Sequence, residues 1–248
     1  LYSNAGFEGG LYAALNALTG DCLGREWERE DGAMLKIEKT LIDANWGQST
    51  DIVYQFCRQS SYSGIVLPSH GRYVGASSKP MTEYRKQPGD RLGFNWMMPN
   101  VAGKRAIRHV IYDTNFWKSF VHARLAVPLG DKGTLSFYGR IPGIHQLLAE
   151  HLTAEYRVRT QGRGRTVDEW KLKPERADNH WLDCVAGCAV CGSMLGAALP
   201  EFNPVRAAFK GKIRLSQRRS GIASETGTVF SATKDKVKLS ELRRKNHG

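Results

Sequence analysis

The chain has 248 residues, of which 41% are hydrophobic, so it is long enough to bury the core of one large domain or two small ones. No apolar run reaches the roughly 18 residues that span a bilayer, so the sequence predicts no membrane-spanning helix and no membrane partner. The five cysteines are odd in number and clustered, which favours a reducing cytoplasm over a secreted, disulfide-bonded fold.

The net charge of +12 is distributed unevenly along the chain. Residues 204–248 hold twelve Lys or Arg against three Asp or Glu, so this tail carries +9 and the preceding body only +3. A basic tail predicts a polyanionic partner, with nucleic acid as the first candidate, although such tails also occur as plain solvated segments. We expect the tail to be largely disordered.

The first part of the chain predicts a βαβ unit. Apolar residues recur at helical spacing within residues 8–30, and Asp31-Gly32 then indicates a turn. Residues 35–43 form an apolar, strand-like run. A helical pattern and a second short strand follow, so residues 35–68 should form two parallel strands joined by a right-handed crossover.

The second part predicts further strands and helices. Residues 69–105 indicate a long basic loop or β-hairpin, and residues 107–112 a strand that leads into a helix capped near Asp113 or Thr114. The segment TLSFYG predicts another strand, and LTAEYRVRTQGRGRTVDEWKLK predicts two more around a Gly-Arg turn. A helix over residues 179–199 then closes the ordered body.

Two aspartates are notable for their places at element ends. Asp43 follows a strand, and strand carboxyl ends form the usual ligand edge of an open α/β sheet, although a simple turn with Asn45 and Gly47 also explains it. Asp183 lies in the first turn of the 179–199 helix, where the helix dipole alone would favour an acid. This helix has no polar face, so we expect it to be buried, and an acid at its mouth then needs a partner such as a divalent cation.

Paired carboxylates of this kind suit metal-assisted hydrolysis of phosphodiesters. Mg²⁺ is held by one or two carboxylates together with waters and substrate phosphates. Two such ions about 4 Å apart activate water and stabilise the leaving oxygen.

A series of motifs resembles the nuclease half of lambda-type phage terminase large subunits. In order, they are LIDANWG, TDIVYQFCR, IYDTNFWKSFVHARL, LTAEY and VDEWKLKPERADNHWLDC. The last is the most specific, because Asn179, His180, Leu182, Asp183 and Cys184 match the family's N-H-x-L-D-C signature. The resemblance spans about residues 10–200.

The resemblance implies an α/β fold with an RNase H-like mixed sheet flanked by helices, in a domain that we place at residues 1–203. It implies an endonuclease that cuts concatemeric double-stranded DNA using Mg²⁺ or Mn²⁺. The expected partners are a small terminase subunit and the portal of an empty procapsid, in the cytoplasm of the bacterial host. Asp43 and Asp183 fall on two metal-binding acids of the family, and Asp178 and His180 are further candidate ligands.

Two departures from the family pattern bear on activity. The chain has no G-x-x-x-x-G-K-[ST] loop of the family's packaging ATPase. The family's first catalytic aspartate, in a V-D-V-Q-like context, has no counterpart here. Because the chain begins at Leu1 without a methionine, we expect a fragment that lacks the sheet's first strands and one metal ligand. A non-catalytic RNase H-like module that binds DNA or packaging partners is therefore the first alternative.

Basic residues near the proposed site are candidates for DNA contact. They are Arg72, Arg163, Arg165 and Lys171. A solvated hairpin would explain the last three equally well. Asp113 and Lys118 match a recurring block of the family, although a helix N-cap and a solvated lysine also explain them.

The cysteines suggest a second alternative. Cys184, Cys188 and Cys191 have the C-x-x-x-C-x-x-C spacing of a radical iron–sulfur enzyme. Iron–sulfur cradles usually lie in loops, whereas these residues fall on one face of a predicted helix. Cysteine is also often buried as a small hydrophobe, so we expect all three to pack in the core.

Overall fold

A computed structural model describes residues 6–101, 107–139, 141, 143–175 and 178–197. The chain divides into the units Leu1–Val205 and Arg206–Gly248. The second unit, which holds most of the predicted basic tail, lies outside the described residues. No helix among the described residues is long and apolar enough to cross a membrane.

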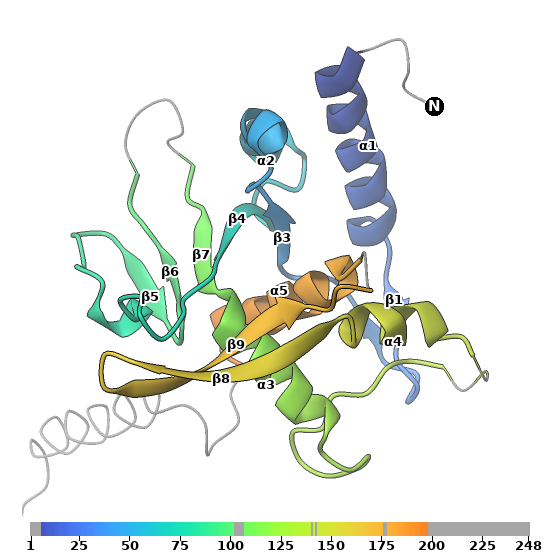
Figure 1. Ribbon diagram of the computed structural model, residues 1–248. Coiled ribbons are helices and arrows are strands. Elements are labelled where there is room, and N and C mark those ends of the chain that lie inside the picture. Colours follow the sequence, from blue (N-terminus) through green and yellow to red (C-terminus); the bar gives the residue numbers. More distant parts are fainter. Residues whose placement is uncertain (1–5, 102–106, 140, 142, 176–177, 198–248) are drawn as a thin grey trace, which may run out of the picture. The chain divides into compact units, whose positions relative to one another are not determined.

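A five-stranded mixed sheet organises the first unit (Figure 1). The strand order is β3-β4-β7-β6-β5. Strands β3, β4 and β7 are parallel, β6 is antiparallel to β7, and β5 is antiparallel to β6. The bounds are β3 Thr40–Asp43, β4 Val66–Arg72, β7 Val110–Asp113, β6 Trp96–Met98 and β5 Arg91–Gly93. The parallel β3 and β4, with a helix between them, confirm the predicted βαβ unit.

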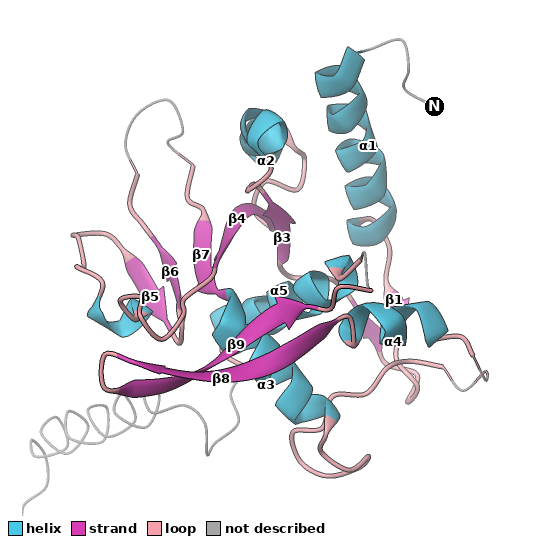
Figure 2. Cartoon of the chain, in the orientation of Figure 1, coloured by secondary structure: helices cyan, strands magenta, loops and turns pink. Residues whose placement is uncertain are grey.

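Helices and two further strand pairs complete the first unit (Figure 2). The α-helices are α1 Gly6–Leu23, α2 Thr50–Gln59, α3 Thr114–Leu125, α4 Gln146–Leu152 and α5 His180–Met194, with short 3-10 helices at Gly47–Ser49 and Met81–Glu83. The antiparallel pairs are β1 Trp27–Glu28 with β2 Met34–Leu35, and β8 Glu155–Gly162 with β9 Arg165–Leu172.

The side chains of successive strand residues point to opposite faces of the sheet, and this alternation separates two helical layers. Ile42 and Val66 pack in a hydrophobic cluster with residues of α2. Leu41 and Leu67 pack in a second cluster with residues of α3 and α5, among them Ala186. Therefore α2 covers one face of the sheet, and α3 and α5 cover the other.

Three sequence predictions are corrected by the fold. The predicted helix over residues 8–30 ends at Leu23, and a helix that the sequence did not predict, α4, precedes β8. The strand predicted for TLSFYG is wrong, because residues 134–139 form no strand. Leu135 and Phe137 instead pack against the cluster of Val121, Leu152 and Leu182, so burial against helices replaces strand pairing.

The N-cap of α3 is confirmed as Asp113. Its side chain accepts a hydrogen bond from the backbone N–H of Phe116 at 3.1 Å, which satisfies one of the unpaired donors of the first turn. The carboxyl group is buried, and burial raises its pKa to about 6 against the lowering effect of backbone hydrogen bonds from Phe116 and Asn115. The folded protein therefore binds this proton more tightly than the unfolded chain does.

This shift predicts a pH dependence of stability. The stability that the folded protein gains from binding this proton is fully present below the pKa of an aspartate in the unfolded chain, about 4. It is lost as the pH rises through about 6, the pKa of Asp113 in the folded protein. Asp113→Asn keeps an N-capping oxygen but cannot ionise. Between pH 4 and pH 7 the variant should therefore lose about 1 to 3 kcal/mol less stability than the wild type loses. Melting curves across this range test the prediction. Asp131→Asn, in an exposed loop, is the control and should follow the wild type.

Candidate functional site

The end of β3 holds Asp43 in an ordered turn. The carboxylate is exposed, and its Oδ1 accepts a hydrogen bond from the backbone N–H of Asn45 at 3.2 Å. The Asn45 side chain ties this turn to β4, because its Nδ2 donates to the carbonyl oxygen of Gly71 at 3.0 Å and its Oδ1 lies 2.8 Å from Nδ1 of His70. The turn expected at Asp43 is thus present, and it fixes the carboxylate at the carboxyl end of the strand.

The two-residue period of a strand places Asp43 on the same face of β3 as Leu41. Leu41 packs in the cluster that contains Ala186 and Val190 of α5. Asp183 lies in the first turn of the same helix. Both aspartates therefore belong to the α5 side of the sheet, although 140 positions separate them in the sequence.

The electrostatics of Tyr112 support this placement. Tyr112 lies on β7 and is buried in the same cluster as Ala186. Burial raises the pKa of its hydroxyl group, and the charges of Asp183 and then Asp43 raise it further, because both anions oppose a phenolate. The two carboxylates therefore act on one buried group.

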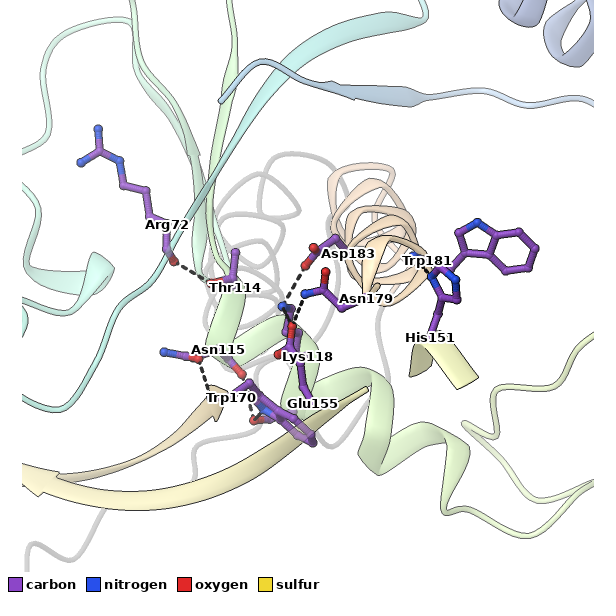
Figure 3. Close-up of polar contacts among 11 residues, drawn as sticks. Arg72, Thr114, Asn115, Lys118, His151, Glu155, Trp170, Asn179, Trp181 and Asp183 are labelled. Atoms are coloured by element: carbon purple, nitrogen blue, oxygen red, sulfur yellow. Dashed lines mark hydrogen bonds and ion pairs between the residues drawn. The ribbon is translucent and has the colours of Figure 1, made fainter. Parts of the chain in front are cut away.

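Asp183 is joined to a buried charge cluster (Figure 3). The ammonium group of Lys118, from α3, lies 2.8 Å from Oδ1 of Asp183 and 2.5 Å from Oε1 of Glu155 at the start of β8. Asn179 donates a hydrogen bond from Nδ2 to the same Glu155 oxygen. Asn179 is the N-cap of α5, but it makes no side-chain cap hydrogen bond. We name Lys118, Glu155, Asn179 and Asp183 the lysine cluster.

The lysine cluster excludes one explanation of Lys118, a solvated lysine, and adds Glu155 to the candidate site. Lys118 is buried between two carboxylates and is not solvated. Glu155 was not singled out from the sequence, where it appeared only within the motif LTAEY. Its one local signal is a charged residue at the first position of a strand, directly after the apolar Ala154, and the structure buries both residues.

The other candidate ligands are Asp178 and His180, at the start of α5. Asp178 and His180 are exposed and approach each other, with 3.4 Å between Oδ1 of Asp178 and Nε2 of His180, an ion pair only when the histidine is protonated. Within the described ranges, no group of three or more His, Cys, Asp or Glu side chains is arranged to hold a metal ion. The metal roles of Asp178 and His180 stay predictions.

The predicted DNA-contact residues have different surroundings. Arg163 is exposed in the two-residue turn between β8 and β9, where it adopts a positive φ of 50° next to Gly164. Lys171 is exposed on β9, and Arg72 is exposed at the end of β4, where its side chain extends away from the lysine cluster (Figure 3). Arg165 instead donates from Nη2 to the backbone carbonyl oxygens of Gly75, at 2.7 Å, and Ser78.

The predicted burial of the cysteines is wrong for two of the three. Cys191 is buried, whereas Cys184 and Cys188 are exposed. The buried stripe of α5 runs through Leu182, Ala186 and Val190, and a position two residues along a helix lies about 200° away from that stripe. All three cysteines lie on a helix and not in a loop, as expected from the sequence.

Comparison with known proteins gives one match. The family model "Terminase large subunit gpA, endonuclease domain" matches residues 12–201. This range contains both aspartates and the whole lysine cluster. No curated protein and no solved structure matched the chain.

Proposed function

Since the chain belongs to the family of terminase large subunit endonuclease domains, with an RNase H-like fold and a nuclease role in phage DNA packaging, we propose that it hydrolyses phosphodiesters of double-stranded DNA with the help of divalent metal ions. Asp43 and Asp183 would be the metal ligands. The observation that carries this proposal is their placement on one side of the sheet, where both charges act on Tyr112.

The carboxylates of Asp43 and Asp183 suit a divalent metal ion. Asp43 is exposed and the side chain of Asp183 is 44% exposed, so both carboxylates can be reached from solvent, and carboxylate oxygens are preferred ligands of Mg²⁺ and Mn²⁺. When bound, such ions lower the pKa of water and stabilise a leaving oxygen. The chain itself holds Asp43 through the Asn45 turn and Asp183 through Lys118.

We propose that a third acid comes from a segment outside the described residues. Among the described strands, β3 is an edge strand that pairs with β4 alone, so a further strand could be added only at its other edge. A strand there would lie beside Asp43.

Contacts with DNA are proposed for three exposed residues, Arg72, Arg163 and Lys171. Arg165 would act mainly as an anchor of the hairpin, because its guanidinium group already donates to two backbone carbonyl groups. Asp178 and His180 would assist metal binding at the N-terminus of α5. The further partners that we propose are the small terminase subunit and the portal of the procapsid, in the cytoplasm of the host bacterium.

A non-catalytic domain that binds DNA or packaging partners is the second candidate function. It is favoured by the lack of a three-ligand group among the described residues and by the ion pair that already occupies one oxygen of Asp183. Binding of Mn²⁺ together with cleavage of plasmid DNA would support the nuclease. DNA binding without either activity would support the alternative.

We predict that, in a protein that also carries the segment supplying the third acid, Asp183→Asn abolishes metal-dependent cleavage and leaves the fold intact. The variant keeps the size of the side chain but removes the charge that would hold the cation. A residue that served only the helix dipole would cost about 0.3–1 kcal/mol and spare activity. Two measurements test this: a melting curve without metal and plasmid cleavage with Mn²⁺. Asp43→Asn should give the same results as Asp183→Asn in both.

The control is Asp131→Asn, an exposed loop acid, which should cleave like the wild type. Full cleavage by Asp183→Asn would refute the ligand role. Loss of cleavage counts as support only when the melting temperature of the variant stays close to that of the wild type.

We also predict that residues 204–248 contribute to DNA affinity through phosphate contacts, given their net charge of +9. Each phosphate contact that is lost should flatten the slope of log K against log salt by about 0.9. Deletion of the tail, followed by salt titrations of DNA binding, tests this. An unchanged slope would assign the tail to protein partners.

A further inference from the structure

The lysine cluster contains a cation whose purpose the proposed function does not explain. Lys118 is buried, and its ammonium group contacts one carboxylate that is enclosed and one that faces solvent. The side chain of Glu155 is 4% exposed, whereas that of Asp183 is 44% exposed. Only Asp183 can therefore meet an incoming ion, and Glu155 supports Lys118 from behind.

The charges of the cluster set its affinity for a second cation. One ammonium and two carboxylate groups leave a net charge of −1, and Oδ1 of Asp183 is already engaged by Lys118 at 2.8 Å. An ion that approaches Asp183 from solvent meets the carboxylate first, the ammonium group next and Glu155 last. Because Coulomb interactions fall with distance, the repulsion from Lys118 outweighs the attraction from Glu155.

We propose that Lys118 is a positioning residue that acts as the resident counter-ion of Asp183. It orients the carboxylate by holding Oδ1, keeps the start of α5 in place when no metal is bound, and weakens the binding of divalent ions to the exposed side of Asp183. The proposal rests on the proposed function, since it takes Asp183 as a metal ligand.

A graded series of variants tests the proposal by direct measurement of Mn²⁺ binding, from the electron paramagnetic resonance signal of free Mn²⁺. Lys118→Met removes the repelling charge, Glu155→Gln removes the supporting anion, and the double variant removes both and restores the net charge of −1. Mn²⁺ affinity should decrease in the order Lys118→Met, double variant, wild type, Glu155→Gln. Lys118→Met should bind Mn²⁺ about tenfold or more tightly than the wild type does.

Two controls separate this role from a structural one. Lys132→Met removes the same charge from an exposed loop and should bind Mn²⁺ like the wild type. Adding Asp183→Asn to each variant should abolish the differences between them. The double variant leaves no unpaired buried charge, so it guards against unfolding of Lys118→Met, and circular dichroism checks that each variant is folded.

Each outcome decides a point. If Lys118 were only a structural partner, every change in the cluster would weaken Mn²⁺ binding. A folded double variant that binds Mn²⁺ no more tightly than the wild type would therefore overturn the proposal. Binding that is lost with Asp183→Asn but shows no graded order would overturn the counter-ion role alone. No Mn²⁺ binding by the wild type or any variant would overturn the metal site of the proposed function and this inference with it.

Discussion

A buried ammonium group must be matched by anions, and the structure around Lys118 follows from this requirement. Lys118 belongs to α3, while its partners Glu155 and Asp183 begin β8 and α5. One cation therefore connects α3 with the starts of β8 and α5, three elements that are distant in sequence. Asn179 strengthens the connection because it donates to Glu155 from the N-cap of α5. Loss of Lys118 alone would leave the carboxylate of Glu155 buried without its charge partner.

The two aspartates could be predicted from the sequence because each is marked by local signals. Asp43 ends an apolar run, and Asp183 opens an apolar helix, so element boundaries alone identify them. The lysine cluster could not be predicted in this way. Lys118 lies five residues after the cap residue Asp113 and looks solvated. Nothing near it indicates that Glu155, 37 residues further along, will meet it. Packing of α3 against β8 and α5 creates the pair.

Burial on α5 shows the same limit of sequence patterns. The apolar composition of the helix predicted its burial, but composition does not say which side meets the sheet. Contact with Leu41 and Leu67 selects the stripe through Ala186 and Val190. Cys184 and Cys188 then face outward, and Cys188 lines an apolar cavity of about 560 Å³ with Trp117 of α3. The face that meets the sheet also decides that Asp183 lies toward Tyr112.

The β8–β9 hairpin (Figure 1) begins at Glu155 of the lysine cluster and carries Arg163 in its turn. Its first residue, Glu155, is held by Lys118. In the middle of β9, Glu169 accepts hydrogen bonds from the backbone N–H of Ala76 at 3.0 Å and from the hydroxyl group of Tyr73 at 2.8 Å. Next to the turn, Arg165 donates to the backbone carbonyl oxygens of Gly75 and Ser78. The hairpin is thus fixed at both ends. Arg163 is carried on a supported strand pair and not on a free loop, so a phosphate held there would keep a constant position relative to Glu155. Through Glu155 and Lys118 the hairpin is joined to Asp183, so a shift of β8 relative to α3 would also move the carboxylate at the start of α5.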